Sequence, residues 1–305
     1  MFTGYMPQLR KPHNNSTDWY KSFYNTYYLS QITNLTIISY MDTFYEINRK
    51  KLIEERFDYL LKKKIIKENE NKKISDWVII DEKRLEEELR SYEIEQGFKD
   101  ILNQAISDRF KLINSYLIFG GVELNESFNK KVSIDFNELL KTTNGKNWYQ
   151  VIQGFLNIWE FLFLFSSVEY TLKDLLSSNV TDNLFSLLLE TYKDINFHNI
   201  GFLPNSGYEE LWKLYVDVRN LFVHTHGVLS SKSRDKILSR AFTVRKNIKE
   251  TIHCMDLDLF DEERFFPKND FIENKFYLLK DVELNLFRNF IITLMETLDE
   301  FIIKE

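Results

Sequence analysis

Cysteine is almost absent from this chain, since Cys254 is the only one among 305 residues. A single thiol cannot form an internal disulfide, and it cannot build a metal site from several cysteines. A reducing compartment therefore fits best, and we predict a cytoplasmic protein. The N-terminus also lacks a basic start followed by an apolar stretch and a small-residue cleavage site, so no secretory signal is expected.

Glycine and proline are scarce as well, with nine and four copies. These residues mark turns, and a β-barrel or β-sandwich needs a turn about every eight to twelve residues. The composition therefore disfavours such folds, and we predict an all-α fold built from long helices. Hydrophobic residues make up 44% of the chain, which is enough for a packed core and unlike the composition of disordered proteins.

Long apolar runs are missing too. The most apolar window, 155–165, spans eleven residues and contains Glu160, whereas a membrane-spanning helix needs about 20 apolar residues. We predict a buried helix here and no membrane association. The formal net charge is −6, so the chain also lacks the globally basic surface that is the simplest sign of a nucleic-acid-binding protein.

Hydrophobic periodicity divides the chain into two regions. Residues 1–40 show no clear periodicity, and we expect an irregular arm followed by a helix. Apolar residues recur at three- and four-residue steps over 42–67 and over about 82–116, which predicts two long amphipathic helices. A polar, mixed stretch then predicts a domain boundary near Gly145. The region 1–145 resembles no family and is a candidate site for a regulatory partner or ligand.

The remaining residues, 146–305, are predicted to form a helical bundle domain. Apolar residues surround the first half of 148–177, which predicts a central buried helix. Shorter amphipathic patterns predict further helices over 181–195 and 282–303. Between them, 231–280 is expected to be irregular or partly helical.

Another helix of this domain has recognisable ends. Ser206 and Glu209 have the spacing of a capping box, in which each side chain satisfies a free backbone amide of the first helical turn. We therefore expect a turn at 204–207 and a helix that begins at Gly207. Gly227 follows the last apolar position of the pattern and is predicted to cap the C-terminal end of the helix.

The same helix contains a sequence motif whose side chains are of types that act in catalysis. It contains Arg219-Asn220-Leu221-Phe222-Val223-His224, an arginine followed by a polar residue and, after three apolar residues, by a histidine. This motif, its place at the end of a helix and the small turn after it resemble the signature of the HEPN family. The pattern of 166–176 resembles the first long helix of that family's bundle. The resemblance covers about 150–305.

The HEPN resemblance implies a compact helical bundle that forms a homodimer with its motif helices facing each other. It also implies, as in many members, a metal-independent endoribonuclease that needs no cofactor, and a role in bacterial toxin or antiphage defence. The implied catalytic residues are Arg219, Asn220 and His224. On a regular helix Asn220 shares a face with His224, whereas Arg219 is rotated by roughly 140° from it.

The chemistry of RNA cleavage fits this set of residue types. Cleavage without a metal needs a base for the 2′-hydroxyl proton, an acid for the leaving 5′-oxygen and a fixed positive charge beside the phosphorane oxygens. Histidine can serve as base or acid, and arginine supplies a permanent charge. One subunit offers a single Arg219 and a single His224, so two subunits at a two-fold axis would supply two of each.

Other interpretations of the motif stay open. His226 follows closely and could act as the base in place of His224. A histidine at a helix C-terminus is also common because its protonated ring is favoured at the negative end of the helix dipole, and Arg219 could simply bridge two helices. HEPN domains also serve as non-catalytic dimerisation, sensing or scaffold modules, which is the competing function.

A basic segment follows the motif directly. Residues 231–249 contain seven lysines and arginines against one aspartate. We predict an RNA-binding strip there, and the alternative is a solvated helical face. The predicted RNA-binding residues are Lys232, Arg234, Lys236, Arg240 and Arg245. The acidic cluster at 256–263 is interpreted as a solvated loop. Because the charge is so uneven, the net charge predicts weak or gated RNA binding and does not exclude it.

Overall fold

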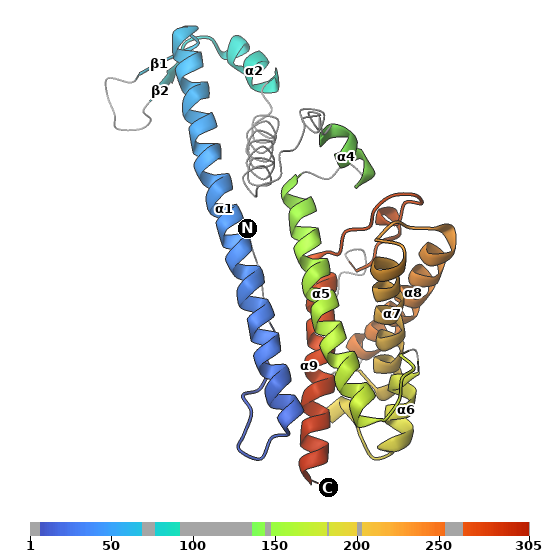
Figure 1. Cartoon of the computed structure of the whole chain (residues 1–305). Coiled ribbons are helices and arrows are strands. Elements are labelled where there is room, and N and C mark those ends of the chain that lie inside the picture. Colours follow the sequence, from blue (N-terminus) through green and yellow to red (C-terminus); the bar gives the residue numbers. More distant parts are fainter. Residues whose placement is uncertain are drawn as a thin grey trace, which may run out of the picture. The chain divides into compact units, whose positions relative to one another are not determined.

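A computed structural model describes residues 7–68, 77–91, 136–143, 148–181, 183–199, 203–253 and 265–304. Over these ranges the protein consists of eight α-helices, two short 3₁₀ helices and one two-stranded sheet (Figure 1). The predicted all-α fold is confirmed. The chain divides into two compact units, the first made of Met1–Thr36 with Asn137–Glu305 and the second of Ile37–Phe136.

This division differs from the predicted domains 1–145 and 146–305. The N-terminal segment belongs to the same unit as the C-terminal helices, and polar contacts explain why. A guanidinium nitrogen of Arg10 lies 3.1 Å from a carboxylate oxygen of Asp299. The other oxygen of Asp299 accepts hydrogen bonds of 2.8 Å from both the backbone amide and the hydroxyl of Thr17.

Helix α1, Asp18–Lys62, is much longer than either helix predicted for this part of the chain. It begins after Thr17, whose hydroxyl oxygen accepts from the Tyr20 amide at 3.4 Å, as an N-cap side chain does. The expected arm followed by a helix is confirmed, but this helix continues without a break through most of 42–67. Its first half buries residues at three- and four-residue steps: Tyr20, Phe23, Tyr27, Ser30, Gln31, Asn34 and Ile38.

The second unit has a small core of its own. Strands β1, Ile66–Glu68, and β2, Trp77–Ile79, pair antiparallel, and helix α2, Glu82–Ser91, follows them. Phe57 of α1 stacks on Trp77 with ring centroids 5.0 Å apart. The rest of the helix predicted over 82–116 lies outside the described residues.

The first unit contains the C-terminal helices of the chain. They are α4 Phe136–Thr142, α5 Trp148–Leu175, α6 Leu184–Thr191, α7 Asn205–His224, α8 Ser231–His253 and α9 Asp281–Lys304, with the 3₁₀ helices η2 Phe197–Asn199 and η3 Lys268–Asp270. The helices predicted over 148–177, 181–195 and 282–303 are therefore confirmed. The segment 231–280 is more regular than expected, because α8 occupies its first half.

Aromatic rings fill the core between α5, α7 and α9. Phe165 of α5 stacks on Trp212 of α7 with centroids 5.2 Å apart. Tyr215 of α7 meets Phe287 of α9 edge to face at 4.9 Å. All four side chains are essentially inaccessible to solvent, so these aromatics stabilise the core, as their helical spacing predicts.

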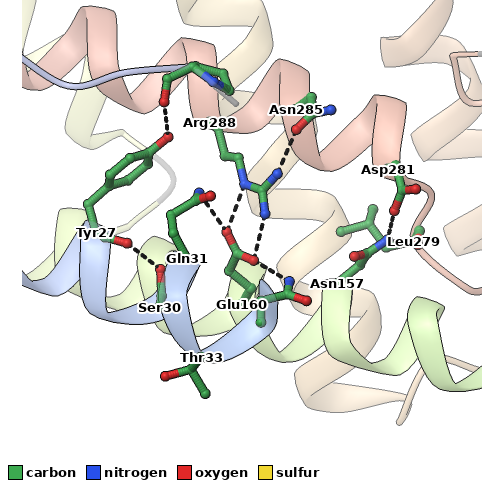
Figure 2. A network of polar contacts seen from close by, with 12 residues as sticks. Tyr27, Ser30, Gln31, Thr33, Asn157, Glu160, Leu279, Asp281, Asn285 and Arg288 are labelled. Carbon is green, nitrogen blue, oxygen red and sulfur yellow. Dashed lines mark hydrogen bonds and ion pairs between the residues drawn. The ribbon is translucent and has the colours of Figure 1, made fainter. Parts of the chain in front are cut away.

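A buried ion pair joins α5 to α9 inside the first unit (Figure 2). Arg288 donates two hydrogen bonds, of 2.7 and 2.6 Å, to the two carboxylate oxygens of Glu160. From α1, Gln31 donates to the same carboxylate at 3.0 Å, and Asn34 donates to it as well. Three helices thus converge on one carboxylate, which fixes the lateral position of α5.

Helix α5 is long and apolar enough over Gln150–Leu175 to cross a membrane, by length and composition. Half of its most apolar window is buried inside the protein, and Glu160 in the middle of the helix is held by the ion pair with Arg288. A half-buried helix with an internal ion pair agrees with the buried helix predicted here.

Candidate functional site at the end of helix α7

The beginning of α7 differs from the sequence prediction. The helix starts at Asn205 after Pro204, with no side-chain hydrogen bond at the cap, so the predicted capping box of Ser206 and Glu209 is wrong. Glu209 instead accepts a hydrogen bond of 2.9 Å from Ser186 of α6. The carbonyl oxygen of Pro204 accepts from the amides of the first turn, because its extended backbone already directs that carbonyl along the helix axis.

The end of α7 lies at the motif, as predicted. His224 is its last residue, and three donors converge on the carbonyl oxygen of Leu221. They are the amide of Thr225 at 3.2 Å, the hydroxyl of Thr225 at 2.7 Å and the amide of Gly227 at 3.1 Å. The carbonyl is therefore fully satisfied, and the helix stops here without fraying.

The turn after α7 is packed tightly. His226 and Gly227 both adopt left-handed backbone conformations, with φ of 51° and 82°. A Cβ at Gly227 would lie 2.5 Å from the ring of Phe276, so glycine is needed there for space as well as for conformation. The Gly227 carbonyl also accepts from the Tyr277 amide at 2.9 Å, which attaches the turn to the segment before α9.

Arg219 and Asn220 form a hydrogen bond with each other. A guanidinium nitrogen of Arg219 donates to the side-chain oxygen of Asn220 at 3.1 Å. Another lies 3.9 Å from a carboxylate oxygen of Glu169 on α5, and the Arg219 side chain keeps 27% of its exposure. Within the described part of the chain, His224 forms no hydrogen bond with Arg219 or Asn220. The regular helix thus separates Arg219 from His224, as its geometry predicts.

Glu169 is a site residue that the sequence did not single out as an acceptor. It also accepts from the ammonium of Lys173 at 2.7 Å and from the hydroxyl of Thr181. Burial by itself would raise the pKa of Glu169, but the hydrogen bonds from Lys173 and Thr181 outweigh it, so the pKa lies below its usual value. Glu169 is therefore a carboxylate that draws Arg219 toward α5.

His224 and His226 are both exposed to solvent. Phe155 contacts Phe276 with ring centroids 5.1 Å apart, and the Phe276 ring packs against Gly227 in the turn after α7. One and two turns after Phe155, the same face of α5 carries Trp159 and Phe163. These two rings stack on each other at 5.6 Å and are 44% and 39% exposed. An exposed aromatic surface therefore adjoins the turn that presents the histidines.

Two members of the predicted RNA-binding strip are engaged inside the unit. The buried carboxylate of Asp217 on α7 lies 2.5 Å from the ammonium of Lys236 and 2.5 Å from a guanidinium nitrogen of Arg240. One negative charge therefore offsets part of the basic surplus and clamps α8 to α7. The sequence offered a signal for this contact, since Asp217 is a lone acid on the apolar side of its helix, but only packing shows which cations reach it.

The other members of the strip do not pair with Asp217. Lys232 is exposed, and Arg234 pairs with its exposed neighbour Asp235 at 3.0 Å. Arg245 makes one long hydrogen bond of 3.5 Å to the Phe265 carbonyl. The structure therefore separates the predicted strip into two cations that Asp217 partly neutralises and three that it does not. The acidic cluster at 256–263 lies outside the described residues.

No family model matches the chain, and no curated protein or solved structure shows significant similarity to it. Among the described residues, no group of three or more His, Cys, Asp or Glu side chains is placed to hold a metal ion.

Proposed function

We propose that this protein is a metal-independent endoribonuclease of the HEPN type, with an active site formed between two copies of the chain. The observation that carries the proposal is the placement of the motif: His224 is exposed at the last residue of α7, and Arg219 is half-buried on the same helix. Neither side chain is enclosed in the core. A cytoplasmic protein of bacterial toxin or antiphage defence would use such a site.

The proposed reaction is attack of the ribose 2′-oxygen on the adjacent phosphorus. The new bond from the 2′-oxygen to phosphorus forms as the bond from phosphorus to the 5′-oxygen breaks. One imidazole takes the 2′-hydroxyl proton, and a protonated imidazole gives a proton to the leaving 5′-oxygen. The products are a 2′,3′-cyclic phosphate and a 5′-hydroxyl. Arg219 stabilises the phosphorane oxygens, and Asn220 orients Arg219 through their hydrogen bond.

A homodimer is required because one chain cannot supply both imidazoles from motif positions. The exposed aromatic surface beside the end of α7 supports this requirement. Trp159 and Phe163 expose their rings on α5, and Phe155, one turn before them, contacts Phe276 near the turn after α7 at 5.1 Å. A surface of this composition beside the motif is suited to a second copy, which would cover it and bring two motifs together.

The decisive experiment is incubation of RNA with the wild type and with His224→Ala in the presence of a chelator. We expect cleavage by the wild type, products with cyclic phosphate ends, and loss of at least about 100-fold in rate for the variant. His198→Ala is the matched control, because His198 is also exposed but lies on η2. Equal cleavage by His224→Ala, or none by the wild type, would remove the assignment.

His226 is tested separately. An alanine at its left-handed position would strain the turn, so His226→Asn is the better variant, since asparagine adopts this conformation readily. Loss of cleavage in His226→Asn with full activity in His224→Ala would transfer the role of base to His226.

A non-catalytic HEPN-type sensor or scaffold is the second candidate. The ion pair of Arg219 with Glu169 favours it, because an arginine that bridges two helices needs no catalytic role. Such a protein would still form a homodimer. Trp159→Glu should then dissociate the dimer in light-scattering measurements, with Phe242→Glu as a control on a different helix, while the wild type cleaves no RNA.

A further inference from the structure

A basic hollow lies on the first unit at the C-terminal part of α8. Its volume is about 610 Å³, which is within the usual range for ligand sites. It lies between α8 and the start of η3. The lining residues are Phe242, Arg245, Lys246, Lys249, Pro267, Lys268 and Asn269.

Helical periodicity explains why the α8 residues share this face. Phe242 lies three and four residues before Arg245 and Lys246, and Lys249 lies four and three residues after them, so all four share one side of the helix. The opposite face of α8 packs into the core of the unit through residues such as Val244. The side chains of the hollow therefore point away from the core.

The opposite wall is fixed to the unit by buried residues. Phe265 and Phe266 are inaccessible to solvent, and the Phe266 amide donates to the buried Glu283 carboxylate at 3.0 Å. The Phe265 carbonyl accepts from Arg245. Pro267 and Lys268 follow directly, so both walls of the hollow belong to segments that pack into the unit.

The described lining of the hollow is basic. Among the described residues, its lining includes four cationic side chains and no acidic one. Lys246 has a weak contact of 3.8 Å with the exposed Glu250 outside the lining. This is the opposite of the surface near the start of α8, where Asp217 offsets Lys236 and Arg240. An anion would be attracted to the hollow more strongly than to any part of the strip that Asp217 neutralises.

An aromatic ring is presented beside these charges. Phe242 is 65% exposed, although a phenylalanine at the surface forgoes burial of its apolar area. Cations that contact phosphates next to an aromatic ring on which a base can stack are the two elements of single-strand recognition. A nucleotide unit presents a phosphate and a base together, so it can use both elements at once.

We propose that this hollow binds a nucleotide unit of single-stranded RNA, with the phosphate at Arg245, Lys246 and Lys268 and the base on Phe242. The choice of RNA over a free nucleotide rests on the proposed function, whereas the nucleotide chemistry follows from the hollow itself. RNA held here would be anchored away from the motif while another part of the strand reaches His224.

The test is titration of fluorescein-labelled single-stranded RNA with the full-length protein carrying His224→Ala, so that cleavage cannot complicate binding. We expect Phe242→Ala in this background to weaken binding about tenfold. Tyr170→Ala, which removes an exposed aromatic ring from α5, is the matched control and should bind as tightly as the parent.

Salt dependence tests the phosphate contacts. Lys268→Ala should lower the slope of log affinity against log salt by about 0.7, the value for one phosphate contact with a single strand. Lys193→Ala, an exposed lysine after α6 that belongs to neither the hollow nor the predicted RNA-binding strip, should leave the slope unchanged. An unaltered slope and affinity for both Phe242→Ala and Lys268→Ala, with unchanged melting temperatures, would overturn the proposal.

Competition with free ATP and AMP separates the two sources of a nucleotide. Displacement of the RNA only at concentrations far above the RNA dissociation constant supports RNA as the ligand, whereas tight binding of the free nucleotide and none of RNA overturns that assignment. The nuclease proposal is tested separately. If RNA binding depends on Phe242 but the wild type cleaves no RNA, the hollow remains an RNA-binding site and the nuclease assignment is wrong.

Discussion

Two ion pairs of the first unit join an arginine to a glutamate of the same helix, α5, yet they differ in geometry and in burial. Arg288 holds both oxygens of Glu160 at 2.6 to 2.7 Å, and neither side chain is more than 5% exposed. Arg219 reaches one oxygen of Glu169 at 3.9 Å and keeps 27% exposure. The first pair is bidentate and shielded from solvent, whereas the second is a single long contact that is partly open to solvent.

The difference indicates which arginine can change partners. Separating Arg288 from Glu160 would leave a buried charge without compensation, so this pair is fixed once the protein has folded. Arg219 loses little when it leaves Glu169, because water replaces the contact and an exposed pair contributes only about 0 to 1 kcal/mol. A phosphate that enters beside α7 could therefore recruit Arg219, as the proposed function requires.

The largest effect is expected from breaking the buried pair. Glu160→Ala should lower the free energy of unfolding by about 3 to 5 kcal/mol, because it leaves the Arg288 guanidinium buried and unpaired. Urea denaturation followed by circular dichroism measures the change. A loss below about 1 kcal/mol would show that water reaches Arg288, and the two ion pairs would then not differ in their contribution to stability.

A buried carboxylate without an arginine extends the comparison. Burial raises the pKa of Glu283 to about 7 from 4.5, against the opposing effect of hydrogen bonds from the Lys280 amide and the Tyr277 hydroxyl. Between these two pH values the native state binds more protons than the unfolded chain, so stability should fall as the pH rises. Over this pH range the free energy of unfolding should fall by about 3 kcal/mol in total.

Glu283→Gln tests this pH dependence. The amide cannot titrate, so the decline in unfolding free energy between about pH 5 and pH 8 should be much smaller in the variant than in the wild type. The slope against pH is the readout, since the amide also alters the hydrogen bonds and shifts the absolute stability. Parallel slopes in the two proteins would mean that Glu283 stays ionised in the fold.

An intermediate effect is expected at Asp217, which is buried but pairs with the partly exposed Lys236 and Arg240. Asp217→Asn should lower the unfolding free energy by about 1 to 2 kcal/mol, because the amide keeps the shape but loses the charge-assisted hydrogen bonds. It should also strengthen RNA binding at low salt, since two cations are released. Unchanged binding would place Lys236 and Arg240 outside the path of the RNA.

The smallest effect on stability is expected at the motif. A double-mutant cycle of Arg219→Ala and Glu169→Ala should give a coupling energy below about 1 kcal/mol. The Arg219→Ala single variant should nonetheless lose RNA cleavage. A coupling of several kcal/mol would make Arg219 a structural residue like Arg288, and it would favour the non-catalytic function.

The buried half of α1 shows why its extent was not predictable from hydropathy. Ser30, Gln31 and Asn34 occupy the buried face of the helix, so the apolar pattern is interrupted where the helix packs. Ser30 donates to the Tyr27 carbonyl of its own helix. Gln31 and Asn34 donate to Glu160, which lies 126 residues or more away along the chain. Hydrophobic periodicity reveals a helix that packs against apolar side chains. It does not reveal a helix whose buried face is polar because that face packs against a buried charge.

The candidate site was predictable in part. The end of α7 at His224 and the need for Gly227 follow from local sequence, because turn geometry depends on few neighbouring residues. The internal use of Lys236 and Arg240 does not, because Asp217 reaches them only after α8 packs along α7. The hollow around Phe242 was not predictable from the sequence either, because its second wall, with Lys268, comes from a different segment.

The sequence by itself determined the all-α class, the main C-terminal helices and the position of the Arg219 to His224 motif, since these depend on composition and on spacing within a few turns. Tertiary structure decided which charges are used internally, which remain available to a ligand, and that the N-terminal arm belongs with the C-terminal helices. The physical reason is that a charge is neutralised by whatever lies within a few ångströms of it, and in a folded chain those neighbours come from distant segments.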